Sequence, residues 1–338
     1  MQKTALVTGS AGFIGYYTAK ALLDAGYQVI GLDAMTDYYD VRLKQRRHQN
    51  LMQNQHFRAL EARLETPNVL HDLLEVYTPD LIVHLAAQAG VRYSIDHPRT
   101  YLDSNLIGVF ELLEAVRAFP PEHLMLASSS SVYGANEQMP YAEHHRADMP
   151  LSFYGATKKA AEGMAHSYAH LYGLPTTLFR FFTVYGPWGR PDMAPFKFTK
   201  AILEGRPIDV YNHGNMRRDF TFIEDLAASI AALGPCVPEA TDVEEIDREE
   251  LGLSPVAPWR VVNIGNNEPV ELGRFIKAIE AATGKTAVKN MLPMQPGDVP
   301  ATWADCSLLE RLIGQRPGTS IEDGVARFVD WYRIYYGA

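Results

Sequence analysis

Cysteine is scarce in this chain, and long apolar runs are missing from it. Only Cys236 and Cys306 occur, so a disulfide framework is excluded, and no spacing of Cys and His residues is typical of a metal site. No apolar run approaches the ~20 residues that a membrane-spanning helix requires. Residues 3–8 already have the pattern of a strand, which indicates that no signal peptide precedes the fold. We therefore expect a cytoplasmic protein that needs neither a metal nor a membrane partner.

Basic residues are fewer than acidic residues in this chain. The 338 residues include 31 Lys+Arg and 40 Asp+Glu, which gives a formal net charge of -9. A negative surface repels a polyphosphate backbone, so we do not expect nucleic-acid binding. Much of this charge lies in an acidic insertion at 236–258, which we interpret as a solvated loop, with a partner-binding tail as the alternative. The hydrophobic share of 47% is ordinary for a globular protein, so the chain can bury a large core.

Strand and helix patterns alternate through the first half of the chain. The strands are continuous apolar runs, which is typical of parallel strands covered on both faces. Strands are predicted near 4–8, 28–32, 57–60, 80–85, 123–127 and 176–182, and helices near 13–25, 41–52, 101–119, 152–172 and 321–336. We therefore predict an α/β protein with a Rossmann-type doubly wound parallel sheet and a smaller C-terminal α/β lobe. The predicted boundary separates 1–182 from 183–338, with some later elements returning to the first domain.

A glycine triplet marks the turn between the first strand and the first helix. Gly9, Gly12 and Gly15 allow a tight turn and let backbone N–H groups approach a pyrophosphate. The N-terminus of the following helix adds a partial positive charge. Asp33 ends the second strand, where a carboxylate can bind ribose hydroxyls and would repel a 2′-phosphate. A packing turn would also contain small residues, but this context favours dinucleotide binding, with NAD preferred over NADP.

Tyr154 and Lys158 lie four residues apart on a predicted helix, so both point to one face. We expect the lysine charge to lower the pKa of the Tyr154 phenol, which would make it a candidate general base. Such a pair is often only a helix surface pair. The hydroxyls of residues 128–131 follow the fifth strand, where a doubly wound sheet places its ligands, and this favours a catalytic role.

These motifs resemble the extended short-chain dehydrogenase/reductase family and, within it, the UDP-glucuronate 4-epimerases. The resemblance covers nearly the whole chain and rests on the glycine loop, Leu85-Ala86-Ala87, Val132-Tyr133-Gly134, Tyr154-x-x-x-Lys158 and the stretches 84–94, 180–193 and 295–299. It implies reversible epimerisation at carbon 4 of UDP-glucuronate to UDP-galacturonate, through a 4-keto intermediate with transient reduction of NAD. It also implies that the C-terminal part, 183–338, is mainly the lobe that binds the UDP-sugar.

The resemblance also implies roles for individual residues. The catalytic residues are Ser129, Tyr154 and Lys158. The NAD-binding residues are Gly9, Gly12, Phe13, Ile14, Gly15, Asp33, Leu64, Leu85, Ala86, Ala87, Asn105, Tyr154 and Lys158. For the substrate, Ser130, Thr183 and Arg190 would hold the carboxylate, Arg218 the diphosphate, and Asp298 the ribose or its loop. A homodimer through the helices at 101–119 and 152–172 is expected.

Several related activities remain as alternatives. Dehydratases and UDP-glucuronate decarboxylases resemble this chain but carry a carboxylate before Val-Tyr-Gly, where Ser130 and Ser131 stand here. Gln295 stands where UDP-galactose 4-epimerases usually have Arg, which favours a uronate over UDP-glucose or UDP-galactose. A non-catalytic NAD-sensing protein would typically lose the Tyr or Lys of the triad. One position departs from the family pattern. Arg63 stands where the family usually carries an Asp that contacts adenine. Separately, we interpret the basic helix face at 42–47 as solvated.

Overall fold

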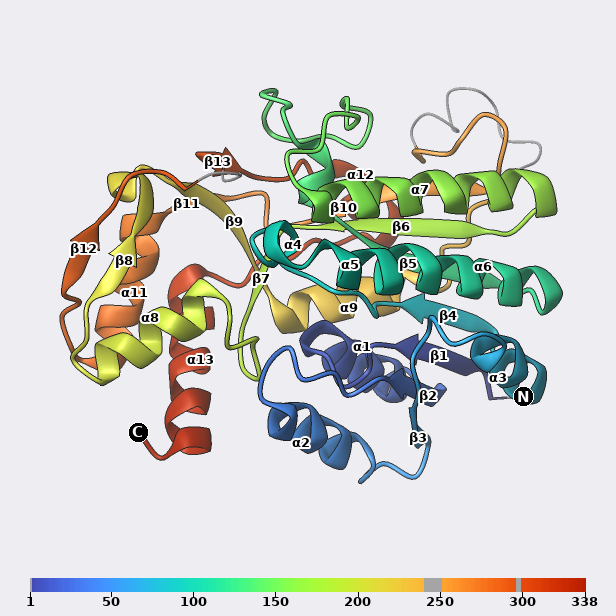
Figure 1. Cartoon of the computed structure of the whole chain (residues 1–338), viewed down its shortest axis with the longest axis horizontal. Helices are drawn as coiled ribbons and strands as arrows, with labels where there is room; N and C mark the ends of the chain where they lie inside the picture. The colour runs from blue at the N-terminus through green and yellow to red at the C-terminus, as the bar shows by residue number, and fades with distance from the viewer. Residues whose placement is uncertain (1, 240–250, 296–298) are drawn as a thin grey trace.

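A seven-stranded parallel sheet forms the centre of the larger part of the molecule (Figure 1). The computed structural model describes residues 2–239, 251–295 and 299–338. The strands of this sheet are β1 (Thr4–Thr8), β2 (Gln28–Asp33), β3 (Phe57–Glu61), β4 (Leu81–His84), β5 (His123–Ser129), β6 (Thr176–Phe181) and β10 (Trp259–Ile264). They follow the order β10-β6-β5-β4-β1-β2-β3, and every neighbouring pair is parallel.

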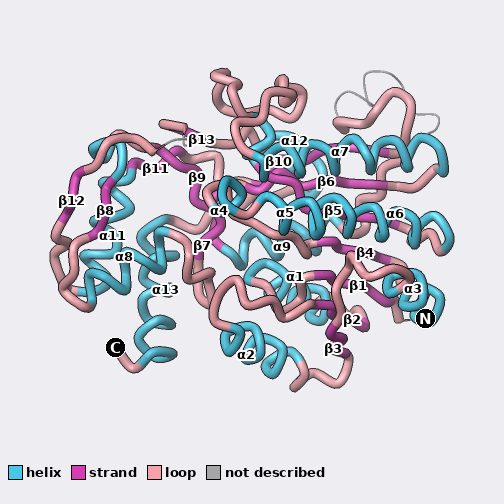
Figure 2. The backbone as a smooth tube through the Cα atoms, in the orientation of Figure 1, coloured by secondary structure: helices cyan, strands magenta, loops and turns pink. Residues whose placement is uncertain are grey.

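Helices cover both faces of this sheet, as Figure 2 shows. They are α1 (Phe13–Asp24), α2 (Val41–Leu51), α3 (Val69–Tyr77), α6 (Gly108–Ala118), α7 (Phe153–Tyr172) and α9 (Ile223–Leu233). Ala5 and Val7 of β1 pack into the core under α1, α2 and α9, and Leu6 packs into the core under α3, α6 and α7. This alternation buries every β1 side chain after Thr4, which explains the continuous apolar run. The predicted doubly wound parallel sheet is confirmed.

The smaller lobe is built around a four-stranded mixed sheet. The strands of this lobe are β7 (Thr183–Tyr185), β9 (Arg217–Phe222), β11 (Pro269–Glu271) and β13 (Ala301–Thr302) in the mixed sheet, with β8 (Ile208–Val210) and β12 (Lys289–Met291) outside it. The helices of the lobe are α8 (Ala194–Leu203), α11 (Leu272–Thr283) and α13 (Ile321–Tyr336). In the mixed sheet β9 pairs with β11 in antiparallel fashion and with β7 and β13 in parallel. A separate parallel pair joins β8 to β12.

Some elements beyond residue 182 belong to the large sheet. β10 adds its last strand beside β6, α9 packs against α1, and α12 (Ser307–Ile313) lies against β10 and α9. The chain therefore passes between the two parts more than once. The expected boundary at residue 182 stays a prediction.

One predicted helix differs in detail. The segment expected as a single helix at 101–119 consists of α5 (Pro98–Tyr101), a π-helical turn (Leu102–Ile107) and α6. The wider π turn carries Asn105, whose amide bonds to the Gln88 backbone and to Thr157 on α7. A short α4 (Tyr93–Asp96) precedes these elements. Hydrophobic periodicity does not distinguish α from π turns, so the sequence predicts the helix but not this detail.

Two expectations concern the remaining chain. Most acidic residues of the insertion at 236–258 fall on residues 240–250, which lie outside the described residues, so its interpretation as a solvated loop stays a prediction. In the described part of the chain, no helix combines the length and apolarity that crossing a bilayer requires.

The turn between β1 and α1 is closely packed and depends on glycine. Gly9 has φ +73°, and a Cβ on it would lie 2.8 Å from the Ala86 nitrogen. A Cβ on Gly12 would lie 2.8 Å from the Gly9 carbonyl oxygen, and one on Gly15 would collide with the same oxygen. Because these neighbours are backbone atoms, they cannot rotate away. The turn therefore excludes side chains at all three positions.

We predict that Gly15→Ala lowers the free energy of unfolding by about 1–3 kcal/mol, because overpacking against fixed backbone forces the turn to shift. Gly273→Ala is the matched control, since Gly273 is exposed near the start of α11 and has open space around its Cα. Glycine is unfavourable in helices, so the control should not destabilise the protein. Urea unfolding of both variants measures the difference, and equal values for the two would contradict the packing argument.

Candidate active site

A cavity lies at the carboxyl ends of β1, β2, β4 and β5, where a doubly wound sheet places its ligands. Most of the predicted site residues line it. They are Gly9, Gly12, Phe13, Ile14, Gly15, Asp33, Leu64, Leu85, Ala86, Ala87, Ser129, Tyr154, Lys158 and Arg190. Residues from four strand ends and from the first turns of α1 and α7 thus meet in one place. This meeting point is the candidate active site.

The dinucleotide end of the cavity is formed by the glycine loop and Asp33. The Asp33 carboxylate accepts backbone N–H groups from Ala11 at 3.1 Å and Met35 at 2.8 Å, which fixes it at the cavity wall. Lys44 Nζ lies 3.9 Å from the same carboxylate. The N-terminus of α1 has no side-chain cap, so its N–H groups face the cavity and suit a phosphate. These residues fit an NAD cofactor.

The basic face of α2 is not solvated, so that expectation is wrong for Lys44 and Arg47, whose residues are only 7% and 0% exposed. Arg47 Nη1 donates hydrogen bonds to the Ala11 carbonyl and to the Tyr39 hydroxyl, both at 2.8 Å. Its other terminal nitrogen donates to the Trp188 carbonyl at 2.5 Å. The charge of this segment suggests an exposed surface, but these partners bind both terminal nitrogens of a buried guanidinium, while its Nε has no hydrogen-bond partner. Arg47 therefore connects the glycine loop to the loop that precedes α8.

Tyr154 and Lys158 share one face of α7, as predicted. Lys158 is 4% exposed, and its Nζ donates to the Ala127 carbonyl at 2.9 Å. Burial lowers the pKa of Lys158 to about 8. Burial also raises the pKa of Tyr154, opposed by a hydrogen bond with Ser129 and by the charge of Arg190. The expected lowering of the Tyr154 pKa by Lys158 is therefore wrong for this structure, because desolvation is the largest effect.

A buried ion pair supports the strand that carries the serines. Arg180 on β6 donates to both oxygens of Glu162 on α7 at 2.9 Å, and both side chains are nearly inaccessible. Ser128 donates to the same carboxylate at 2.7 Å. Burial opposes the charge on Glu162, but the Arg180 guanidinium holds the pKa of this carboxyl below its ordinary value. The end of β5 is thereby tied to α7, one strand residue before Ser129.

Several predicted residues do not line the cavity. Asn105 is buried behind it, where its amide joins Gln88 to Thr157 on α7. Ser130 starts a short 3-10 helix, Thr183 starts β7, and Arg218 lies on β9 with a hydrogen bond to the Val299 carbonyl at 2.7 Å. Asp298 lies outside the described residues. The predicted cofactor role of Asn105 and the predicted substrate roles of the other residues stay predictions.

Other residues line the cavity although no sequence motif pointed to them. Tyr38 and Tyr39 precede α2, and Ser104 lies in the π-helical turn after α5. These positions carry no glycine or charge signature of a cofactor motif. Among the lining residues that the prediction missed, Lys44 could have been found from the sequence, because it lies eleven residues after Asp33 on the helix that follows the same strand. Arg63 also lines the cavity and pairs with Glu65 at 2.8 Å, close to Leu64. Residues 62–65 thus form one wall despite the unusual arginine.

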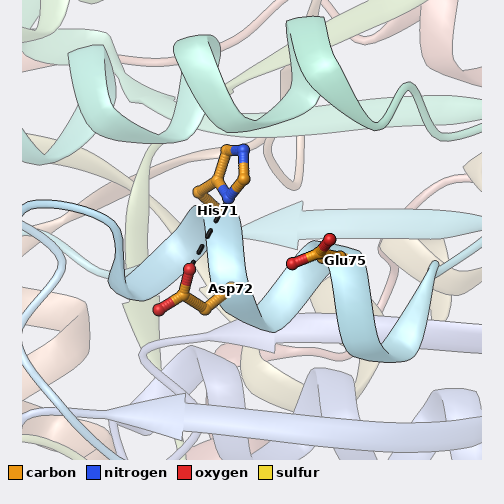
Figure 3. Close-up of side chains that lie close together, drawn as sticks. All are labelled: His71, Asp72 and Glu75. Atoms are coloured by element: carbon orange, nitrogen blue, oxygen red, sulfur yellow. Dashed lines mark ion pairs between the residues drawn. The ribbon is translucent and has the colours of Figure 1, made fainter.

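One cluster among the described residues has a spacing compatible with a metal ion. His71, Asp72 and Glu75 lie on α3, and Figure 3 shows their side chains together on its surface. All three residues are exposed, and none lines the cavity. His71 Nδ1 lies 3.6 Å from an Asp72 oxygen. Exposed groups of this kind are common on helix surfaces, so we assign no role to the cluster.

The comparisons with known proteins agree with this geometry. A model of the family described as GDP-mannose 4,6 dehydratase matches residues 6–328. The chain belongs to this family of extended short-chain dehydrogenases/reductases. A Rhizobium meliloti protein named probable UDP-glucuronate 4-epimerase is 56% identical over 331 residues, which cover 98% of this chain and 97% of the relative. The predicted family is thereby confirmed.

More distant members of the family are also similar over most of their length. UDP-glucuronate 4-epimerase 6 of Arabidopsis thaliana is 44% identical over 337 residues, covering 98% of this chain and 72% of the relative. A crystal structure of UDP-glucuronic acid 4-epimerase from Bacillus cereus, in complex with UDP-glucuronic acid and NAD, has a TM-score of 0.86 and 33% identity. That comparison covers 98% of this chain and all of the other chain. The fold class is the same.

For this extended short-chain dehydrogenase/reductase we predict that Lys158→Met changes the pH dependence of stability. The pKa of Lys158 is about 8 in the folded protein, against 10.5 for a lysine in water. Between these values the unfolded chain binds a proton that the folded chain does not, so wild-type stability should rise with pH relative to the variant. Chemical unfolding between pH 7 and 11, at matched nucleotide content, measures this difference. Parallel curves would mean that burial does not depress the Lys158 pKa.

Proposed function

We propose that the protein is an NAD-dependent UDP-glucuronate 4-epimerase. It interconverts UDP-glucuronate and UDP-galacturonate through a 4-keto intermediate with transient reduction of NAD. The observation that carries this proposal is the meeting of Ser129, Tyr154 and Lys158 with the glycine loop in one cavity. The 56% identity to a probable UDP-glucuronate 4-epimerase and the fold shared with an epimerase that binds UDP-glucuronic acid and NAD support it.

The family is named after a dehydratase, but the serines at 128–131 argue against a dehydration reaction in this protein. Elimination of water from a sugar needs an acid beside the reacting carbon. The two positions before Val132 are Ser130 and Ser131, whose hydroxyls do not supply a proton at neutral pH. The Ser129 hydroxyl donates to Ser131 at 3.2 Å, so this segment forms a hydroxyl cluster. These residues suit a hydrogen-bonding role toward a sugar and favour epimerisation.

The chain's own residues handle the proton at the sugar 4-hydroxyl. Bound NAD would supply the redox chemistry at carbon 4. Tyr154 accepts the hydroxyl proton, and Ser129 orients that hydroxyl and the phenol. Because burial raises the Tyr154 pKa, the phenolate needs nearby positive charge. Arg190 lowers this pKa in the structure, and we propose that Lys158, on the same helix face, adds to its effect during the reaction. The Ala127 carbonyl holds the Lys158 ammonium in place.

The substrate carboxylate imposes a second requirement. Oxidation at carbon 4 makes the uronate a β-keto acid, which loses carbon dioxide when the carboxylate bond aligns with the carbonyl π system. Hydrogen-bond donors must hold the carboxylate out of this alignment. Arg190 lines the cavity and offers a planar fork for it, with Ser130 and Thr183 as further donors. On the nucleotide side, Arg218 and Asp298 are the proposed contacts to UDP.

We also propose a homodimer that is formed by the outer faces of α6 and α7. Three large side chains are exposed there, with Phe110 at 45%, Leu171 at 63% and Tyr172 at 45%. Gly163 on α7 has open space around its Cα and would allow a second helix to approach closely. Apolar side chains grouped on two neighbouring helices are typical of such an interface. The expected cytoplasmic location stays a prediction.

We predict that Tyr154→Phe lowers kcat for UDP-glucuronate epimerisation by about 10²-fold or more, because the proton acceptor is lost. Copurified NAD should remain bound, since the phenyl ring still fills its place. Tyr77→Phe on α3 is a matched control outside the cavity and should keep wild-type activity. Coupled turnover assays and the NAD content of the purified proteins check both statements. Full activity of the Tyr154 variant would remove Tyr154 from the mechanism.

For the homodimer, we predict that Leu171→Glu shifts the protein toward the monomer, because a charge would be buried in the interface. Ile334→Glu on α13 is the control, since Ile334 is even more exposed but lies on a different helix of the smaller lobe. Sedimentation equilibrium measures the oligomeric state of each. A dimer that is unaffected by the Leu171 variant, or weakened equally by both, would place the interface elsewhere.

A further inference from the structure

Arg190 and Asp192 form an ion pair with two hydrogen bonds on the loop between β7 and α8. Arg190 Nε donates to one Asp192 oxygen at 3.0 Å, and Nη2 donates to the other at 2.5 Å. The pair is partly buried, with 20% of the Arg190 side chain and 29% of the Asp192 side chain exposed. Arg190 lines the cavity beside Tyr154. The guanidinium proposed to meet the substrate carboxylate is thus already bound to a carboxylate of the chain.

Tyr38 anchors Asp192 from a distant part of the sequence. Its hydroxyl donates to Asp192 Oδ2 at 3.1 Å, and its ring lies 5.8 Å from the Arg190 guanidinium carbon. Tyr38 itself lines the cavity between Asp33 and α2. Asp192 therefore has a partner other than Arg190. Its carboxylate can stay in place and keep a hydrogen bond when the guanidinium turns toward another anion.

Similar ion pairs with two-residue spacing occur on the surface, and they show what is unusual here. In Arg42–Asp40, Arg146–Asp148 and Arg206–Glu204 the arginine side chains are between 57% and 83% exposed. Water screens such pairs, and they contribute little. Attraction and desolvation are both stronger in the partly buried pair. The Asp192 carboxylate therefore offsets part of the positive charge that Arg190 brings to the cavity.

An epimerase of a uronate has two opposed needs at this position. The carboxylate must be held while carbon 4 is oxidised, yet the keto sugar must turn over before it is reduced. A guanidinium without another partner would hold the carboxylate tightly in one orientation and slow the turn. Asp192 uses only one edge of the Arg190 guanidinium. Nε and Nη2 donate to the Asp192 carboxylate, whereas Nη1 forms no hydrogen bond with Asp192. The group can therefore be shared between two carboxylates.

We infer that Asp192 is a specificity-determining residue that exchanges Arg190 with the substrate carboxylate. It weakens ground-state binding of the uronate and takes the guanidinium back while the keto sugar turns. A neutral hexose has no carboxylate to compete, so its binding is independent of Asp192. This inference rests on the proposed uronate function and deepens it.

The test compares Asp192→Asn with wild type for one charged and one neutral sugar nucleotide. Turnover of UDP-glucuronate gives KM and kcat, and UDP-glucose used as a competitive inhibitor gives Ki. Isothermal titration of both nucleotides measures affinity without requiring turnover. Asp192→Ser is a second variant that removes the same charge from a smaller side chain. Asp148→Asn is the matched control, because Asp148 has the same spacing to its arginine but is exposed and outside the cavity.

The inference predicts that both Asp192 variants bind UDP-glucuronate about fivefold or more tightly, because an unshared guanidinium attracts the carboxylate more strongly. Their kcat should fall, while the Ki of UDP-glucose should stay within about twofold of wild type. The Asp148 variant should match wild type throughout. Equal loss of affinity for both nucleotides would mean that Asp192 only supports the loop, and unchanged affinities would mean that it has no effect on Arg190.

The two proposals can fail separately. If wild-type protein binds UDP-glucuronate without converting it, the epimerase function fails, while the titrations still test Asp192. If wild type is an active epimerase and the Asp192 variants keep its KM and kcat, the function stands and the role of Asp192 is rejected.

Discussion

The buried guanidinium of Arg47 is the contact on which the geometry of the site depends. It is fully inaccessible and joins the Ala11 carbonyl of the glycine loop to the Trp188 carbonyl of the loop before α8. A charge buried in this way is costly unless its donors find acceptors, so both loops must be in place when the protein is folded. Trp188, in turn, precedes Arg190 by two residues. One side chain therefore fixes the cofactor loop relative to the loop that meets the substrate.

A second buried group performs the same task behind the catalytic residues. Glu162 lies two helical turns after Tyr154 and binds both Arg180 on β6 and Ser128 on β5. Lys158, between Tyr154 and Glu162 on α7, bonds to the carbonyl of Ala127. Since β5 and α7 are held together at the two residues just before Ser129, the serine and the tyrosine cannot separate without breaking buried polar contacts. Such rigidity suits proton transfer, which requires a fixed distance between donor and acceptor.

Sequence alone predicts those parts of the site that depend on residues close together in the chain. The glycine loop, Asp33 and the Tyr154–Lys158 pair were all predicted, because each depends on a turn, a strand end or a helical spacing. The burial of Lys44 and Arg47 was not predicted, since their partners lie elsewhere in the sequence. For the same reason, the raised pKa of Tyr154 was missed, because desolvation depends on packing.

The pairing of Arg190 with Asp192 has a local spacing, yet it too could not be recognised from the sequence. Identical spacing at Arg146 and Asp148 gives an exposed pair, so only the fold distinguishes a surface contact from one in the cavity. The cofactor contact of Asn105 stays a prediction from a family pattern, and the structure adds that its amide joins the Gln88 backbone to α7. Motif matching identifies the position, and only the packing shows what the side chain touches.

The most direct test of this account is proton NMR of the sugar when the purified protein is incubated with UDP-glucuronate and no added NAD. The account predicts conversion to UDP-galacturonate without release of a UDP-pentose, because NAD copurifies and the carboxylate is held. Formation of UDP-xylose or a 4-keto pentose would contradict the argument on carboxylate retention and indicate a decarboxylase. No conversion even with NAD supplied would contradict the proposed substrate.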